Sequence, residues 1–362
     1  MTSFRKYFVY HFRSTFLRFV IIAVLALLVV SVSVSVYDST YYGKDLAMGA
    51  RYQDVNISVL NTLAAIISTV IPILELVPFK NKRNMDTMLF LPIGRRKMAA
   101  VHFINGFIHV FLINFVCFLA AFFILIANSA IILYPWSFPL LFAVNLLGSF
   151  IVYSVTAFIF DRANTTADGI VWLVIYSFIG VFIFAAGRSI YEDINRTVSY
   201  PKKGDFLIES SMSPYSVLLF LGNSLHKNLF RLTYVRSGDS IEVIQSYREN
   251  VDSPEINGAI LWSAIAIACA FGFIWLFKNK RPEEIGGISS SPFGYKVLLP
   301  VTAIAVINFE ADEIALIAIM LVVMIVGYII YRRSIRFKLW DYISMAIGLL
   351  VPLAIGIINS VY

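Results

Sequence analysis

Blocks of about 20 apolar residues with few or no charges recur along the chain, and each has the length that a helix needs to cross the hydrocarbon core of a membrane. Val20–Val30 and Ile314–Ile330 are unbroken examples. Neither block alternates as the strands of a membrane barrel would, and the alternating stretch Ser31–Val36 is too short for such a strand. Because 59% of the 362 residues are hydrophobic and only 14% are charged, we predict an all-α polytopic membrane protein.

Hydropathy predicts nine membrane spans. Their ranges are 16–36, 57–78, 99–127, 138–160, 169–186, 259–277, 297–309, 314–331 and 342–360. The seventh span is short, follows Lys296 directly and contains Pro300, so a tilted helix, a re-entrant segment and a total of eight spans remain open. No cleavable signal peptide is expected, because the first apolar run is too long for a signal-peptide core. Cys117 and Cys269 both lie in apolar runs, so no disulfide is expected.

Basic residues predict the orientation of the chain. With the N-terminus in the cytoplasm, the internal segments carry 18 Lys and Arg against six acidic residues, and the short external segments carry two against six. The internal segments are 1–15, 79–98, 161–168, 278–296 and 332–341, and the short external ones are 37–56, 128–137 and 310–313. The positive-inside rule therefore predicts a multi-pass protein of the cell (inner or plasma) membrane with a cytoplasmic N-terminus. The net charge of +7 then faces anionic lipid, and no nucleic-acid partner is needed to explain it.

Two segments outside the spans are predicted to fold. Residues 3–15 place aromatic and basic residues at helical spacing, which fits either an interfacial amphipathic helix or a long first helix with a basic end. The external segment 187–258 is long enough for a small domain, either a passive cap or one that contacts substrate. Within it, Ser213-Pro214 indicates a helix start, and the apolar run Tyr215–Leu225 is predicted to pack on the outer membrane surface or over the external ends of the spans. A turn then precedes Ile241–Tyr247, a strand or a short helix.

The cytoplasmic segment between the second and third spans carries the main functional prediction. Asn84 is a candidate cap for a short helix that Pro92 ends. The apolar residues of this helix are Met85, Met88, Leu89 and Phe90. Apolar side chains on a short cytoplasmic helix fit the surface groove of a soluble partner, and an ordinary interfacial loop is the alternative.

The same segment resembles the type-2 ABC transporter permeases, especially those of Gram-positive bacteria. Asn81-Lys82-Arg83-Asn84-Met85-Asp86-Thr87, followed by Leu91-Pro92-Ile93-Gly94-Arg95, is similar to the "NKR..D.L.sLPisR" stretch of that family, which also lies between the second and third spans. After the sixth span, Phe277-Lys278-Asn279-Lys280-Arg281-Pro282-Glu283-Glu284-Ile285-Gly286 is similar to the family's "RpaE.aG" stretch. The resemblance covers roughly residues 1–286.

The resemblance implies a six-helix permease core, and two to three additional C-terminal transmembrane helices depart from the family's pattern. It implies an interfacial elbow helix at 1–15, spans one to five within 16–186 and the sixth span at 259–277. The long extracellular domain at 187–258 and the linker with extra helices at 278–362 are departures from the family. The helix at 84–91 would be the coupling helix that docks on the ATPase. The implied coupling residues are Met85, Asp86, Met88, Leu89, Phe90, Leu91, Pro92 and Arg95, and the second cytoplasmic motif contributes Arg281, Pro282, Glu283 and Gly286.

The resemblance further implies an exporter of an amphipathic or hydrophobic substrate such as a peptide, an antimicrobial compound or a lipid-linked molecule. Its partners would be cytoplasmic ATPase subunits, membrane lipid, and a second copy of this chain or a related permease. The chain contains no G-x-x-x-x-G-K-[ST] loop, and its four histidines and two cysteines show no metal-ligand spacing. We therefore expect no enzymatic activity, metal or cofactor in this chain, with ATP and Mg²⁺ bound by the partner ATPase.

Glu75 is the one acidic residue within the first six spans, and an ionisable group in hydrocarbon suggests a functional site. Its partner is expected in the basic residues 80–83 or on a neighbouring helix, unless Glu75 merely reaches the interface. His102 and His109 lie about two turns apart on one helix face, where they line a polar pathway or serve helix packing. These residues favour an alternative function, a secondary or ion-coupled transporter that uses Glu75. A lipid-modifying enzyme with its site in 187–258 is a third, weaker hypothesis, because that segment has no recognisable nucleophile and base.

Overall fold

The structure, a computed structural model, describes residues 2–40, 50–127, 136–178, 180, 212–230, 232–237, 240–246, 253–280, 282–287, 289, 291, 293–295, 298–301, 314–332, 334–348 and 350. Within these residues, five helices are long and apolar enough to cross a membrane. They are α1 (Thr2–Ser33), α2 (Val59–Leu76), α4 (Arg95–Ile126), α5 (Ser137–Arg162) and α9 (Ser253–Leu276). The chain thus has the helical framework of a polytopic membrane protein.

These five helices coincide with the predicted first, second, third, fourth and sixth spans. A shorter apolar helix, Thr166–Phe178, begins where the fifth span was predicted, and most of 179–186 lies outside the described residues. The predicted eighth span coincides with helix α11 (Ile314–Arg332). Most of the predicted spans 297–309 and 342–360 also falls outside the described part of the chain.

The N-terminal region is one long helix, so the separate interfacial helix predicted at 1–15 is not found. Helix α1 contains no proline or glycine that would interrupt it. Tyr7, His11 and Thr15 recur every four residues on one buried face, and α1 packs against α4. The chain therefore follows the alternative expectation of a long first helix with a basic end.

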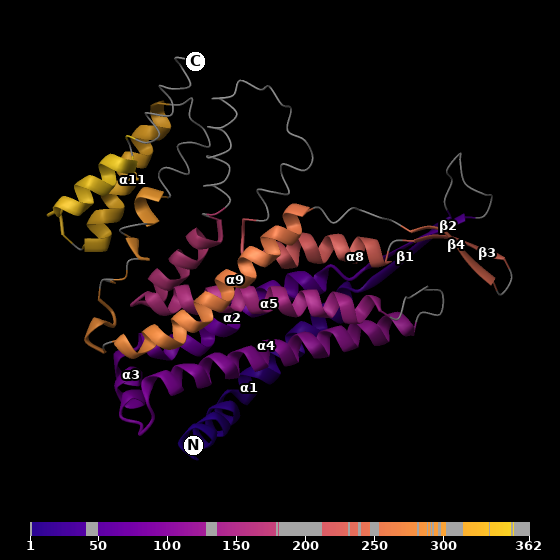
Figure 1. Ribbon diagram of the computed structural model, residues 1–362, viewed down its shortest axis with the longest axis horizontal. Coiled ribbons are helices and arrows are strands. Elements are labelled where there is room, and N and C mark those ends of the chain that lie inside the picture. The colour runs from indigo at the N-terminus through magenta and orange to yellow at the C-terminus, as the bar shows by residue number, and fades with distance from the viewer. Residues whose placement is uncertain are drawn as a thin grey trace. The chain divides into compact units, whose positions relative to one another are not determined.

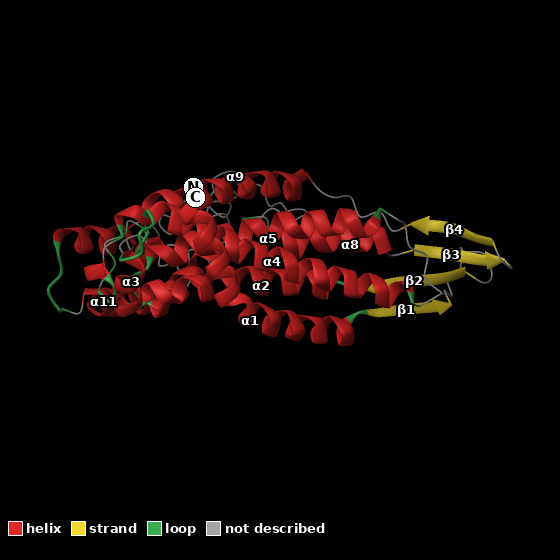
Figure 2. Cartoon of the chain, turned by 90° about the horizontal axis from the view of Figure 1, so that it is seen from below, coloured by secondary structure: helices red, strands yellow, loops and turns green. Residues whose placement is uncertain are grey.

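A four-stranded antiparallel sheet, which the prediction of an all-α chain misses, lies beyond one end of α2 and α5 (Figures 1 and 2). Its order is β1 (Ser35–Thr40), β2 (Ala50–Asn56), β3 (Leu232–Ser237) and β4 (Ser240–Ser246). Strand β2 pairs with β3, so two loops far apart in the sequence share one sheet. The predicted domain at 187–258 is thus not self-contained, because half of its sheet comes from the loop after α1. Within 241–247, the strand alternative is confirmed.

The segment after Pro214 forms a helix as predicted, beginning with the π-helical turn η2 (Val217–Leu221) and continuing as α8 (Gly222–Phe230). Leu218 is fully buried against Ala64, Ala65 and Val152 of α2 and α5. The Tyr215 and Thr69 hydroxyls are 3.0 Å apart, near the middle of α2. The segment therefore enters the helix bundle instead of lying on the membrane surface or only over the ends of the spans.

The chain divides into two compact units. Unit 1 comprises Met1–Glu75, Pro92–Val155 and Pro214–Ile274, and unit 2 comprises Leu76–Leu91, Thr156–Ser213 and Trp275–Tyr362. Unit 1 holds the sheet and most of the long helices. Unit 2 holds short helices that follow the long ones, namely η1 (Val77–Lys80), α3 (Lys82–Leu89), η3 (Phe277–Asn279) and η4 (Pro282–Glu284), together with α11.

The close packing of α5 on η2 gives a testable prediction. A Cβ atom at position 148 would lie 2.6 Å from Leu218 Cγ, and Leu218 has no free space in which to move because it is fully buried. Replacing Gly148 with valine should therefore destabilise the protein by about 1–3 kcal/mol. The measurement is the thermal unfolding midpoint of the purified protein. Gly94→Val is the matched control, because a Cβ at position 94 meets nothing within 4 Å; equal midpoints for the two variants would contradict this packing.

Candidate functional site

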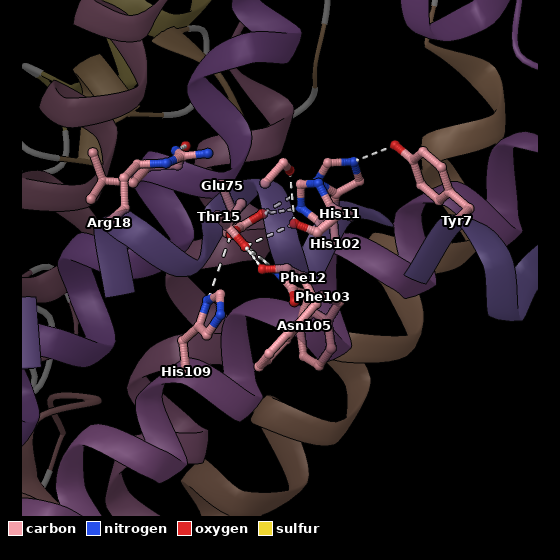
Figure 3. A network of polar contacts seen from close by, with 12 residues as sticks. Tyr7, His11, Phe12, Thr15, Arg18, Glu75, His102, Phe103, Asn105 and His109 are labelled. Atoms are coloured by element: carbon pink, nitrogen blue, oxygen red, sulfur yellow. Dashed lines mark hydrogen bonds and ion pairs between the residues drawn. The ribbon is translucent and has the colours of Figure 1, made fainter. Parts of the chain in front are cut away.

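Unit 1 contains a buried carboxylate surrounded by three histidines. Glu75, in the last turn of α2, is only 5% exposed. His11 Nε2 lies 2.7 Å from Glu75 Oε2, and His102 Nδ1 lies 3.3 Å from the same oxygen. His109 Nδ1 is 3.9 Å from Glu75 Oε1 (Figure 3). We call this group, with the polar residues that bond to it, the Glu75 cluster: Tyr7, His11, Thr15, Glu75, His102, Asn105 and His109.

Hydrogen bonds hold these side chains in place. The Tyr7 hydroxyl lies 3.0 Å from His102 Nε2, the ring nitrogen that faces away from Glu75. The Asn105 amide donates to Glu75 Oε1 at 3.2 Å and to Thr15 Oγ1 at 3.2 Å. Both carboxylate oxygens of Glu75 are therefore engaged, one by His11 and His102 and the other by Asn105.

Helical spacing explains how three segments supply one cluster. On α1 the contributing residues recur every four positions, and on α4 they recur at spacings of three and four, so each set lies on one face. Gly106 lets α4 approach α2 and α5 closely. A Cβ at that position would overlap the Tyr153 hydroxyl of α5 and lie 3.1 Å from Glu75 Cγ.

The sequence identified Glu75, His102 and His109 as candidate pathway residues, and the structure brings all three together. Two sources of a partner for Glu75 were predicted, a neighbouring helix or the basic residues 80–83. The hydrogen bonds of Glu75 described by the structure come from the neighbouring helices α1 and α4. His11 also belongs to the site, although the sequence pattern did not indicate it. Its signal was the spacing of Tyr7, His11 and Thr15, which we interpreted as an amphipathic surface rather than as a buried polar face.

A second buried polar group, in unit 2, surrounds the C-terminus of α5. The Lys80 ammonium donates to the carbonyl oxygens of Phe160 at 2.5 Å and Asp161 at 3.2 Å, and also to that of Ala163. Lys280 donates to the Asp161 carboxylate at 2.7 Å and to its carbonyl at 3.0 Å. The last carbonyls of a helix lack partners within it, so these two lysines act as a cap.

The lysines belong to two copies of one pentapeptide, Phe-Lys-Asn-Lys-Arg, at 79–83 and 277–281. The first copy follows α2 and the second follows α9. The rings of Phe79 and Phe277 are both fully buried and pack edge to face with centroids 5.1 Å apart. The two copies therefore join the ends of two long helices within unit 2.

The predicted coupling helix is present as α3, but its contacts differ from the expectation. Asn81, rather than Asn84, caps it by accepting a hydrogen bond from the Arg83 amide at 3.1 Å. Met85 is fully buried within the protein, so it is not an exposed docking residue, whereas Phe90 is 87% exposed. Asp86 and Met88 are half-buried, and Leu91, Pro92 and Arg95 are exposed. The Leu89 side chain lies outside the described part of the chain.

The second motif, at 281–286, lies against the first. Helix α3 contacts η4, which contains Pro282 and Glu283. Gly286 follows with a φ of +79°, a conformation that favours glycine, and its amide donates to the Asn164 carbonyl at 3.2 Å. Arg281 lies outside the described residues. Two motifs almost 200 residues apart in the sequence thus form one surface of unit 2. We call this surface, made of α3 and η4, the α3 surface.

The Glu75 cluster has the groups to bind a proton or a cation, whereas the α3 surface has the apolar side chains to bind a protein. No protein-family model, curated protein or solved structure matches the chain. The geometry of these two sites, together with the sequence motifs, is therefore the basis for a functional proposal.

The capping role of Lys80 is testable with a matched pair of substitutions. Lys80→Met removes the donor from several buried carbonyl oxygens, each of which costs about 1–3 kcal/mol when left without a partner. Lys82→Met, two residues away, alters an exposed side chain. We expect Lys80→Met to lower the thermal unfolding midpoint clearly and Lys82→Met to leave it nearly unchanged. A similar midpoint for both variants would argue against the cap.

Proposed function

We propose that this chain is the membrane-spanning permease subunit of an ABC transporter and that a separate ATPase subunit drives it. The observation that carries this proposal is the α3 surface, on which the two motifs that resemble type-2 ABC permeases lie side by side. In this proposal the protein resides in the cell membrane with a cytoplasmic N-terminus, and the α3 surface faces the cytoplasm.

The shape of α3 suits a docking element. Buried Met85 fixes one face of the short helix to its own unit, while Phe90 and Leu91 project apolar surface at its C-terminal end. A phenylalanine exposed to this extent has lost the benefit of burial, which a groove on a partner protein would restore. Lys82 and Arg83 are also exposed, and they add positive charge around the apolar contact.

The remaining parts of the proposal follow from the resemblance. The six-helix core would pair with a second copy of this chain or with a related permease. The partner ATPase would bind ATP and Mg²⁺, so this subunit is itself no enzyme. The transported substrate would be amphipathic or hydrophobic, such as a peptide, an antimicrobial compound or a lipid-linked molecule, and the direction would be export.

Co-purification tests the ATPase contact. Phe90→Asp combined with Leu91→Asp places two charges where an apolar groove should receive the helix, and we expect the ATPase to be lost from the detergent-solubilised complex. Trp136→Asp is the control, because Trp136 is 80% exposed and lies outside α3. Wild-type protein isolated from its native membranes without any associated ATPase would refute the proposal.

The Glu75 cluster favours a second candidate, an ion-coupled transporter that moves substrate without ATP. A carboxylate and three imidazoles buried together can exchange a proton or a cation as the helices move. This candidate predicts transport by the purified chain in vesicles under an ion gradient alone, and loss of that transport in Glu75→Gln. Transport that requires both ATP and an ATPase subunit would eliminate it.

A further inference from the structure

We propose that His11, Glu75 and His102 form a binding site for one divalent transition-metal ion of the zinc class. One ligand atom from each residue lies within 4.8 Å of the other two. The site would join α1, α2 and α4, and it depends neither on an ATPase nor on a particular substrate. The inference rests on the ligand set and its hydrogen-bonded surroundings.

The ligand atoms are already close to the arrangement that zinc requires. With metal–ligand bonds of about 2.0–2.1 Å, the ligands of a tetrahedral zinc ion lie about 3.3 Å apart. His102 Nδ1 and Glu75 Oε2 are 3.3 Å apart, and His11 Nε2 lies 2.7 Å from that oxygen. These two distances differ from the tetrahedral spacing by well under 1 Å, and the ligand atoms of His11 and His102 lie within 4.8 Å of each other. Two imidazoles and one carboxylate favour zinc or a similar metal over Mg²⁺ and Ca²⁺, which prefer oxygen ligands.

The surroundings orient the ligands as metal sites usually require. A metal-bound histidine normally donates its second N–H to an oxygen nearby, and the Tyr7 hydroxyl is 3.0 Å from His102 Nε2. Glu75 directs Oε2 toward the two histidines while Asn105 donates to Oε1. Both His102 and Glu75 are thus held by a second layer of hydrogen bonds, with the binding atoms left facing one another.

A small cavity lies beside Glu75, on the side where His109 approaches the carboxylate. A cavity of about 20 Å³ adjoins the cluster, lined in part by Glu75, His109 and Arg18, and this volume accommodates one water molecule. His11 and His102 do not line this cavity, so the fourth ligand of the ion would be a water molecule that the ion itself brings. The Arg18 guanidinium bonds to the Leu74 carbonyl at 3.3 Å and lies on the other side of Glu75 from His11 and His102 (Figure 3).

A simple ion pair explains less of this arrangement. The imidazole rings of His11 and His102 have centroids 4.0 Å apart, so two protonated rings would repel each other strongly at this distance in a medium of low dielectric constant. A single carboxylate needs one such cation for neutralisation. A metal ion instead uses both neutral rings and the carboxylate together, because each supplies a lone pair to the same point.

The test is metal binding by the purified, tag-free full chain in detergent. We expect wild-type protein to bind one equivalent of Zn²⁺ by calorimetry, and Co²⁺ in its place to show the intense visible absorption of a four-coordinate site. Excess Mg²⁺ should not compete. Tyr7→Phe, which keeps the ring and the fold, should weaken Zn²⁺ binding by about 10–100-fold.

Substitution of the ligands should have a larger effect than Tyr7→Phe. His11→Ala, Glu75→Gln and His102→Ala are each expected to abolish the Co²⁺ spectrum. His226→Gln is the matched control, because His226 is a buried histidine that bonds to the Val55 carbonyl, away from the cluster. The His226→Gln protein should bind Zn²⁺ as the wild-type protein does. No Zn²⁺ binding by folded wild-type protein, or binding that Tyr7→Phe leaves unchanged, would overturn the proposal.

Discussion

The cost of burying charge in an apolar protein determines how the polar residues of this chain are arranged. An acidic side chain near the centre of a membrane helix costs about 2.5–3.5 kcal/mol on insertion scales, and it persists only where other groups neutralise it. Glu75 and Asp161 are both almost completely buried, and each is surrounded by basic side chains from segments distant in the sequence. Neutralising these two carboxylates therefore constrains which helices lie together within each unit.

In unit 2 the constraint is met by a repeated sequence. Each Phe-Lys-Asn-Lys-Arg copy provides a buried ring and a lysine, but Lys80 is the second residue of its copy and Lys280 the fourth. Both lysines nevertheless reach the end of α5, because η1 and η3 turn the chain differently after their long helices. Helix α3 begins within the first copy, at Lys82, and η4 begins directly after the second, at Pro282. The contact between α3 and η4 thus follows from the contact between the two copies, which brings together the ends of α2 and α9.

Hydropathy was sufficient to predict the long helices, because water is absent from the hydrocarbon core and a helix satisfies its own backbone. The sheet was not predictable in this way. The pairing of β2 with β3 joins residues about 180 positions apart, such as Gln53 and Leu232, and neither loop has a strong alternating pattern. The same limit applied to the Glu75 cluster. Spacing within one helix identified His102 and His109, whereas the contact with His11 depends on how α1 packs against α4.

The two buried carboxylates differ in the groups that bind them. Both oxygens of Asp161 are bound to the cations Lys280 and Arg162, which suits a structural role. The partners of Glu75 are histidines and an amide, and among them His109 Nε2 and Asn105 Oδ1 are buried without a hydrogen-bond partner among the described residues. Unpaired buried polar atoms are costly and are retained where they serve a purpose. The Glu75 cluster therefore has the spare bonding capacity expected of a site that takes up an ion.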